Sequence, residues 1–119
     1  MAEPPRFSRD FDPAAALRIY IGESDKYQGK PLYESIVLKA REMGLAGATV
    51  LRSPLGFGAS SHLHTSKILR LSEDLPIVIE IVDQREHLDA FIPQIKKMVK
   101  GGLVTWRDVE VLHYDSAGE

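Results

Sequence analysis

Hydrophobic and polar positions follow regular periods over most of the chain, and these periods predict its first elements. The segment AAALRIYIG (Ala14–Gly22) alternates apolar and polar side chains after Ala16 and ends on glycine, which predicts a half-buried strand. Apolar side chains then recur at helical spacing between Pro31 and Gly44, which predicts a helix that begins at a proline and stops at a glycine. A second strand is predicted over Ala46–Ser53.

The second half of the chain predicts another helix between strands. Strand pieces are expected at Lys67–Leu71 and Ile77–Val82, and a last strand is expected at Val109–Tyr114. In the helix, apolar side chains between Leu88 and Val99 recur at intervals of three and four residues.

The ends of this second helix carry recognisable signals. Asp83 and Glu86 have the spacing of a capping box, and Gly101–Gly102 provide a stop. Pro93 removes one backbone donor inside the helix, so we expect a kink or a restart there.

The order strand, helix, strand, strand, helix, strand predicts an α+β fold. With right-handed crossovers it gives a ferredoxin-like βαββαβ sandwich, in which two helices cover one face of a four-stranded antiparallel sheet. Ile77–Val82 is apolar on both of its faces, so we expect the open face of the sheet to be covered by self-association.

Length and composition bound the answer further. The chain has 119 residues, 44% of them hydrophobic, and a formal net charge of −2, which is typical of one globular domain and argues against a nucleic-acid partner. It has no cysteine, which excludes disulfides and thiolate metal sites. We expect a flexible arm at 1–13, a domain at 14–114 and a tail at 115–119. No apolar run of membrane-spanning or signal-peptide length is present, so a cytoplasmic location is expected.

The predicted topology places three polar, glycine-bearing connections at one end of the domain: 22–30, 54–66 and 100–102. Gly56–Ser61 and Lys100–Gly102 could each present backbone N–H groups to an anion. A flexible hairpin loop and an ordinary helix stop are the alternatives. Arg52 lies next to the longer loop and could neutralise a phosphate.

The 54–66 loop also carries other chemistry. His62 and His64 would point the same way on a strand and could share a metal, although no third ligand stands beside them. A ligand contact or a surface position is the alternative. Phe57 and Trp106 are candidates for stacking on a base. Nucleophilic catalysis by the serines of this loop would need a positioned base and an orienting acid, and the sequence does not show that geometry.

Several segments together resemble a known family. Gly22–Asp25, Gly29–Glu34, Gly56–Ser61 and Ile68–Asp83 resemble, in this order, the PII-like proteins catalogued as domain of unknown function one-ninety. The resemblance covers about residues 14–114.

The resemblance implies a ferredoxin-like fold and a homotrimer similar to the PII signal-transduction proteins. In PII relatives, small effectors, often adenine nucleotides, bind in clefts between subunits, between the loops that correspond here to Pro54–Ser66 and Lys100–Gly102. The first loop is short for a PII loop and has no tyrosine, and the second lacks the glycine-rich phosphate motif. The association of family members with fluoride-export genes implies a membrane transporter as a partner.

These observations lead to the hypothesis of a non-enzymatic, homotrimeric regulator that binds a small anionic effector, with an adenine nucleotide as the expected ligand, and signals through the 54–66 loop. The alternatives are a ligand-independent interaction module, and a metal-binding protein or small hydrolase that uses His62 and His64. The expected ligand-binding residues are Gly56, Phe57, Gly58, Ser60, Ser61, Lys100, Gly101, Gly102 and Arg52.

Overall fold

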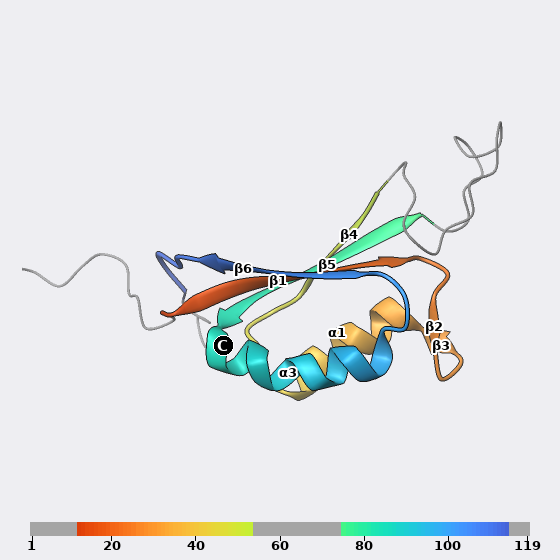
Figure 1. The fold of residues 1–119 in the computed structure, drawn as a ribbon, viewed down its shortest axis with the longest axis horizontal. Helices are drawn as coiled ribbons and strands as arrows, with labels where there is room; N and C mark the ends of the chain where they lie inside the picture. The colour runs from red at the N-terminus through yellow and green to blue at the C-terminus, as the bar shows by residue number, and fades with distance from the viewer. Residues whose placement is uncertain (1–11, 54–74, 115–119) are drawn as a thin grey trace, which may run out of the picture.

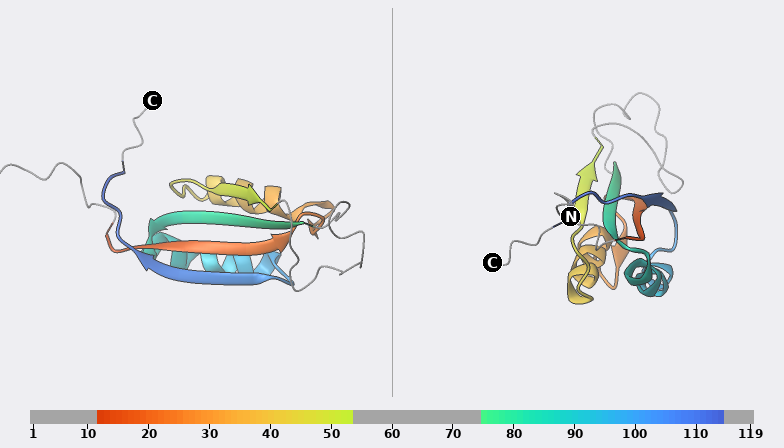
Figure 2. Two further views of the ribbon diagram at one scale, coloured as in Figure 1. Left: turned by 90° about the horizontal axis from the view of Figure 1, so that it is seen from above. Right: turned by 90° about the vertical axis from the view of Figure 1, so that its left-hand side faces the viewer.

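The structure is a computed structural model that describes residues 12–53 and 75–114, which form two layers (Figure 1). One layer is a four-stranded antiparallel sheet, and the other consists of two helices that lie side by side on one of its faces (Figure 2). The sheet strands are β1 (Ala14–Gly22), β4 (Thr49–Arg52), β5 (Pro76–Gln84) and β6 (Leu103–Val109). The helices are α1 (Leu32–Glu42) and α3 (Arg85–Met98), and a small hairpin of β2 (Lys26–Tyr27) and β3 (Lys30–Pro31) precedes α1.

The strand order confirms the predicted fold class. The sheet runs β4-β5-β1-β6, and each neighbouring pair is antiparallel. The two central strands are therefore the first and third of the four in chain order, which is the ferredoxin-like arrangement.

Apolar side chains from both layers form the core. Alternate residues of β1 and β5 face the helices, and each helix contributes its apolar stripe at intervals of three or four residues. Pro93 lies within α3, which continues as one helix, and its side chain is exposed. Neither helix in the described part of the chain is long and apolar enough to cross a bilayer. The largest fully buried apolar residues are Leu17, Ile19, Ile36, Ile77, Ile79, Ile81, Leu88 and Phe91.

The sheet face opposite the helices carries an apolar row that crosses all four strands. The register places Leu51 opposite Val78, Val78 opposite Tyr20, and Tyr20 opposite Leu103. Directly opposed residues point to the same face. Leu51 and Leu103, on the two edge strands, are each 56% exposed.

The next row on this open face is polar and contains an ion pair. Arg18 donates from Nε to Glu80 Oε2 at 2.7 Å. This hydrogen bond raises the pKa of the guanidinium above its ordinary value. The pair fixes two long side chains at the centre of the face, beside the apolar row.

A buried carboxylate, Asp83, lies near the C-terminal end of β5, between the sheet and the helices. Asp83 is 2% exposed and faces the helices. Its Oδ2 accepts the Ala46 N–H at 2.8 Å, and its Oδ1 accepts the Gln84 N–H at 2.6 Å and contacts His87 Nδ1 at 2.9 Å. The predicted capping box is therefore wrong: Gln84 is the N-cap, without a side-chain cap bond, and Asp83 joins the start of α3 to the segment before β4.

The strands differ from the sequence-based expectation in three places. Strand β4 (Thr49–Arg52) is shorter than the predicted Ala46–Ser53. The last strand is β6, six residues earlier than the predicted Val109–Tyr114, because residues 103–109 are the ones that pair with β1. The 22–30 connection, expected to be a plain loop, contains the β2–β3 hairpin, whose turn holds Gln28 and Gly29 at positive φ. The strand piece expected at Lys67–Leu71 lies outside the described residues.

Candidate functional site

The three polar connections of the sequence analysis, as far as the structure describes them, lie at one end of the domain, near the C-terminal end of β1. The Glu23 N–H donates to the Leu75 carbonyl at 2.9 Å, and the Ser53 N–H donates to the Pro76 carbonyl at 2.9 Å. The segment after β1, the end of β4 and the start of β5 therefore lie together, and the α3–β6 connection lies at the same end (Figure 1). This confirms the predicted convergence for the parts of the three connections that the structure describes.

Arg52, the last residue of β4, contributes a positive charge at this end. Its Nη2 lies 2.8 Å from Glu23 Oε2, and both side chains are partly exposed. Because water screens such pairs, they contribute little to stability and separate easily. Arg52 is therefore available to an anion that competes with the Glu23 carboxylate.

Gly102 fixes the path of the α3–β6 connection against β1. Its φ is +133°, and an added Cβ would lie 2.5 Å from the Tyr20 carbonyl oxygen. Only glycine fits this approach without displacing backbone. The preceding Lys100 and Gly101 are exposed, so their backbone lies at the surface.

A groove of about 400 Å³ lies between the last turns of α3 and strand β6. Its polar rim comes from Lys96, Lys100 and Gly101–Gly102, and one of its walls is Trp106. Trp106 packs partly against the core and donates its indole N–H to Asp108 at 3.2 Å, which fixes the ring. This combination of ammonium groups, a glycine backbone and an aromatic wall suits an anionic ligand with a planar part.

A smaller hollow of about 160 Å³ adjoins this groove through Lys100 and Gly101. Lys26 and Asp25 line it from the segment after β1. One Asp25 oxygen accepts the Gly22 N–H at 3.0 Å, which folds this segment back toward β1. The two lysines make the hollow a second place where negative charge would be favoured.

The chain matches the family model described as "Uncharacterized ACR, COG1993" (DUF190) over residues 14–111. It belongs to the DUF190 family. Two UPF0166 proteins are similar to it in sequence. One, from Aquifex aeolicus (strain VF5), is 39% identical over 97 residues, covering 82% of this chain and 91% of the relative. The other, from Methanocaldococcus jannaschii, is 34% identical over 99 residues, with the same two coverages.

Solved structures with PII-like folds are similar to this DUF190 chain in architecture. A Thermus thermophilus protein described as PII-like and signalling aligns with a TM-score of 0.59 at 14% identity, covering 84% of this chain and 90% of that one. CPII from Thiomonas intermedia K12, bound to ADP and bicarbonate, aligns with a TM-score of 0.50 at 20% identity, covering 89% and 95%. At these identities the similarity shows the fold alone.

The structure brings together part of the predicted site in this DUF190 protein. Lys100, Gly101 and Gly102 line the α3–β6 groove, whereas Arg52 lies at the same end of the domain but on β4, the opposite edge strand of the sheet, where it pairs with Glu23. The remaining expected positions lie outside the described residues, so their contacts and the histidine metal hypothesis stay predictions. These positions are Gly56, Phe57, Gly58, Ser60, Ser61, His62 and His64.

Sequence reasoning missed Lys96 as a site residue. Lys96 lies in the last turn of α3 and Lys100 follows the extended C-cap residue Val99, so the two lysines do not share a helix face although both line the groove. The two lysines can be recognised as site residues only once β6 places Trp106 on the other side of the groove.

Proposed function

We propose that this DUF190 protein is a homotrimeric PII-like regulator that binds a small anionic effector, an adenine nucleotide, between subunits. The α3–β6 groove is the observation that carries the proposal, because it combines two lysines, a glycine backbone and Trp106 in a volume suited to a small molecule. The fold shared with CPII, which was solved with ADP and bicarbonate, supports the same chemistry. The regulator proposed here catalyses no reaction and acts in the cytoplasm on a partner protein, such as a membrane transporter.

In this proposal the phosphates meet the backbone of Gly101–Gly102 and the Lys100 ammonium. Arg52, released from Glu23, would come from a neighbouring copy, because within one copy it lies on the opposite edge of the sheet. Gly56–Ser61 would supply further backbone donors. Binding would then change the surface that the 54–66 loop presents to the partner, because the ligand binds one loop conformation better than the others.

Replacing Lys100 with alanine should weaken ADP binding about tenfold, since a charge-assisted contact is lost. Gly58→Val should weaken it as well, because a branched side chain would block close approach of the loop backbone. Isothermal titration with ADP measures both. Arg41→Ala removes a positive charge from α1, outside the groove, and should leave the affinity unchanged. The site assignment is wrong if both Lys100→Ala and Gly58→Val bind ADP like the parent protein.

The open sheet face supports the proposed assembly. An apolar row that includes two leucines, each more than half exposed, runs across the whole sheet. Packing copies of this face together would remove the row from water, and each square ångström of apolar surface buried contributes about 25 cal/mol.

Introducing a charge into this row should prevent assembly. Leu51→Asp and Leu103→Asp each place a carboxylate at a surface that would be buried in the trimer, so we expect a lower mass by light scattering coupled to size exclusion. Leu38→Asp on α1 is the matched control, because Leu38 is 62% exposed on the helix side of the molecule. An unchanged mass for both sheet variants would contradict assembly through this face.

A further inference from the structure

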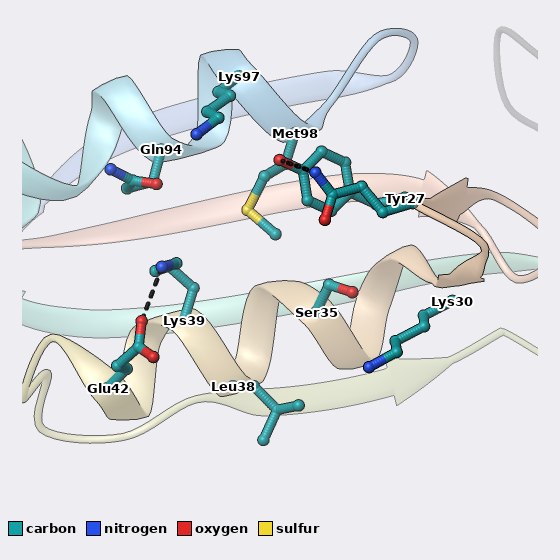
Figure 3. A pocket seen from close by; sticks show the side chains of 10 residues that line it. Tyr27, Lys30, Ser35, Leu38, Lys39, Glu42, Gln94, Lys97 and Met98 are labelled. Carbon is teal, nitrogen blue, oxygen red and sulfur yellow. Dashed lines mark hydrogen bonds and ion pairs between the residues drawn. The ribbon is translucent and has the colours of Figure 1, made fainter.

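A second groove, of about 450 Å³, lies between the two helices (Figure 3). Its lining residues belong to α1, α3 and the β2–β3 hairpin, and it shares none of them with the α3–β6 groove. Because the helices cover the face of the sheet opposite the apolar row, this groove stays open when copies associate through that row. It is therefore a separate site from the one proposed for the effector.

Polar side chains from both helices converge in this groove. Gln94 and Lys97 lie on α3, Lys39 extends from α1 toward that helix, and Lys30 runs from the hairpin along α1 (Figure 3). The volume lies within the range of small-molecule sites.

The charge of the groove is strongly one-sided. Three ammonium groups line it, against the single carboxylate of Glu42, which pairs with Lys39 at 2.7 Å. Within residues 12–53 and 75–114, Lys30 and Lys97 have no carboxylate at ion-pair distance. Two positive charges are thus left uncompensated on different walls of one hollow. Such an arrangement favours a ligand with more than one negative charge, because each charge can approach a different lysine.

The groove also has apolar surface. Met98 separates it from the smaller hollow beside Lys100, since its side chain lines both, and the aliphatic side chain of Leu38 borders the groove on α1. The Tyr27 ring forms part of the wall at the hairpin end, where its hydroxyl accepts a hydrogen bond from Gln28 at 3.5 Å. A ligand with a carbon skeleton would therefore contact apolar surface as well as the lysines.

We propose that the groove between α1 and α3 is a second ligand site, which binds a small organic polyanion through Lys30 and Lys97. Polycarboxylates and phosphate compounds share the required chemistry. Occupation of this site would not require the adenine-nucleotide site, so the two proposals stand or fall separately.

Amide chemical shifts of the full-length protein test the proposal directly. Citrate and inorganic pyrophosphate are the two probes, and acetate at equal ionic strength is the monovalent control. We expect saturable shifts at Ser35, Gln94 and Met98 with at least one polyanion and none with acetate. The stronger probe identifies whether carboxylate or phosphate is preferred.

Two sets of variants separate this site from general electrostatics. Lys30→Gln with Lys97→Gln should weaken probe binding by at least about tenfold, since two charge-assisted contacts are lost. Arg41→Gln with Arg107→Gln removes the same net charge outside the groove and should leave the affinity unchanged. Glu42→Gln should tighten binding by about two- to threefold, because the groove loses its one carboxylate, which repels a polyanion. Glu34→Gln, on α1 but outside the lining, is its control.

Three results would overturn the proposal. One is the absence of saturable shifts with either polyanion. Another is a set of shifts confined to Lys100, Gly101 and Trp106, which would assign the binding to the α3–β6 groove. The third is equal weakening by the two double variants, which would indicate a diffuse response to net charge.

Discussion

Replacing Asp83 with alanine should lower the free energy of unfolding by about 3 kcal/mol, because three hydrogen-bonded groups lose a buried carboxylate at once. The Ala46 N–H, the Gln84 N–H and the His87 ring all contact this side chain. The cost stays below the sum of three lost bonds, since the His87 side chain is about half exposed and can turn to water.

Denaturant unfolding, at one protein concentration for all variants, measures this effect. Asp89→Ala is the matched control, because Asp89 is an exposed carboxylate on α3, six residues further along the chain; its stability should change by less than about 0.5 kcal/mol. Asp83→Asn keeps the shape but brings an amide N–H₂ toward N–H donors, so an intermediate loss is expected. If Asp83→Ala unfolds like the control, the carboxylate does not hold the two layers together.

Asp83 also illustrates where local sequence signals stop being sufficient. Its spacing to Glu86 fits a capping box, and a residue at this point does precede the helix. However, Asp83 continues the alternation of β5, which points its side chain toward the helices. The partner that decides its role, Ala46, is 37 residues away in the chain. No local pattern contains that contact.

The last strand was misplaced for a related reason. Residues 103–109 and 109–114 each mix apolar and polar side chains without strict alternation, so periodicity does not choose between them. The choice follows from pairing with β1, in which Trp106 lies opposite Leu17. Central strands such as β1 and β5, with long apolar alternation, were predicted correctly because burial on the helix side leaves little freedom of register.

The candidate site was predictable in its location more than in its composition. Topology alone places Lys100–Gly102 and Arg52 at one end of the domain, since the direction of each element follows from the order of the elements. The pairing of Arg52 with Glu23, and the groove that joins Lys96 to Trp106, depend on side chains from different elements. These contacts appear only when the strands and helices have been assembled.

Replacing Gly102 with alanine should cost roughly 2–6 kcal/mol of folding free energy, because backbone strain and overpacking each contribute about 1–3 kcal/mol. The φ of +133° disfavours any side chain, and the new methyl group would meet the Tyr20 carbonyl on the central strand. Strand β1 cannot move away at low cost, since its Tyr20 is paired on both sides, with Val78 and Leu103.

Two other glycines allow the effect of backbone strain to be separated from the effect of steric overlap. Gly44 has a φ of +78°, but an added Cβ would have open space around it. Gly44→Ala should therefore lower the free energy of unfolding by about 1 kcal/mol, from strain alone. Gly47→Ala has neither feature and should be close to neutral. Denaturant unfolding should therefore rank the losses as Gly102, Gly44 and Gly47. Because Gly102 lines the α3–β6 groove, its variant should also bind ADP more weakly, whereas the other two should not. A Gly102→Ala protein as stable as Gly44→Ala would mean that the α3–β6 connection can shift away from β1.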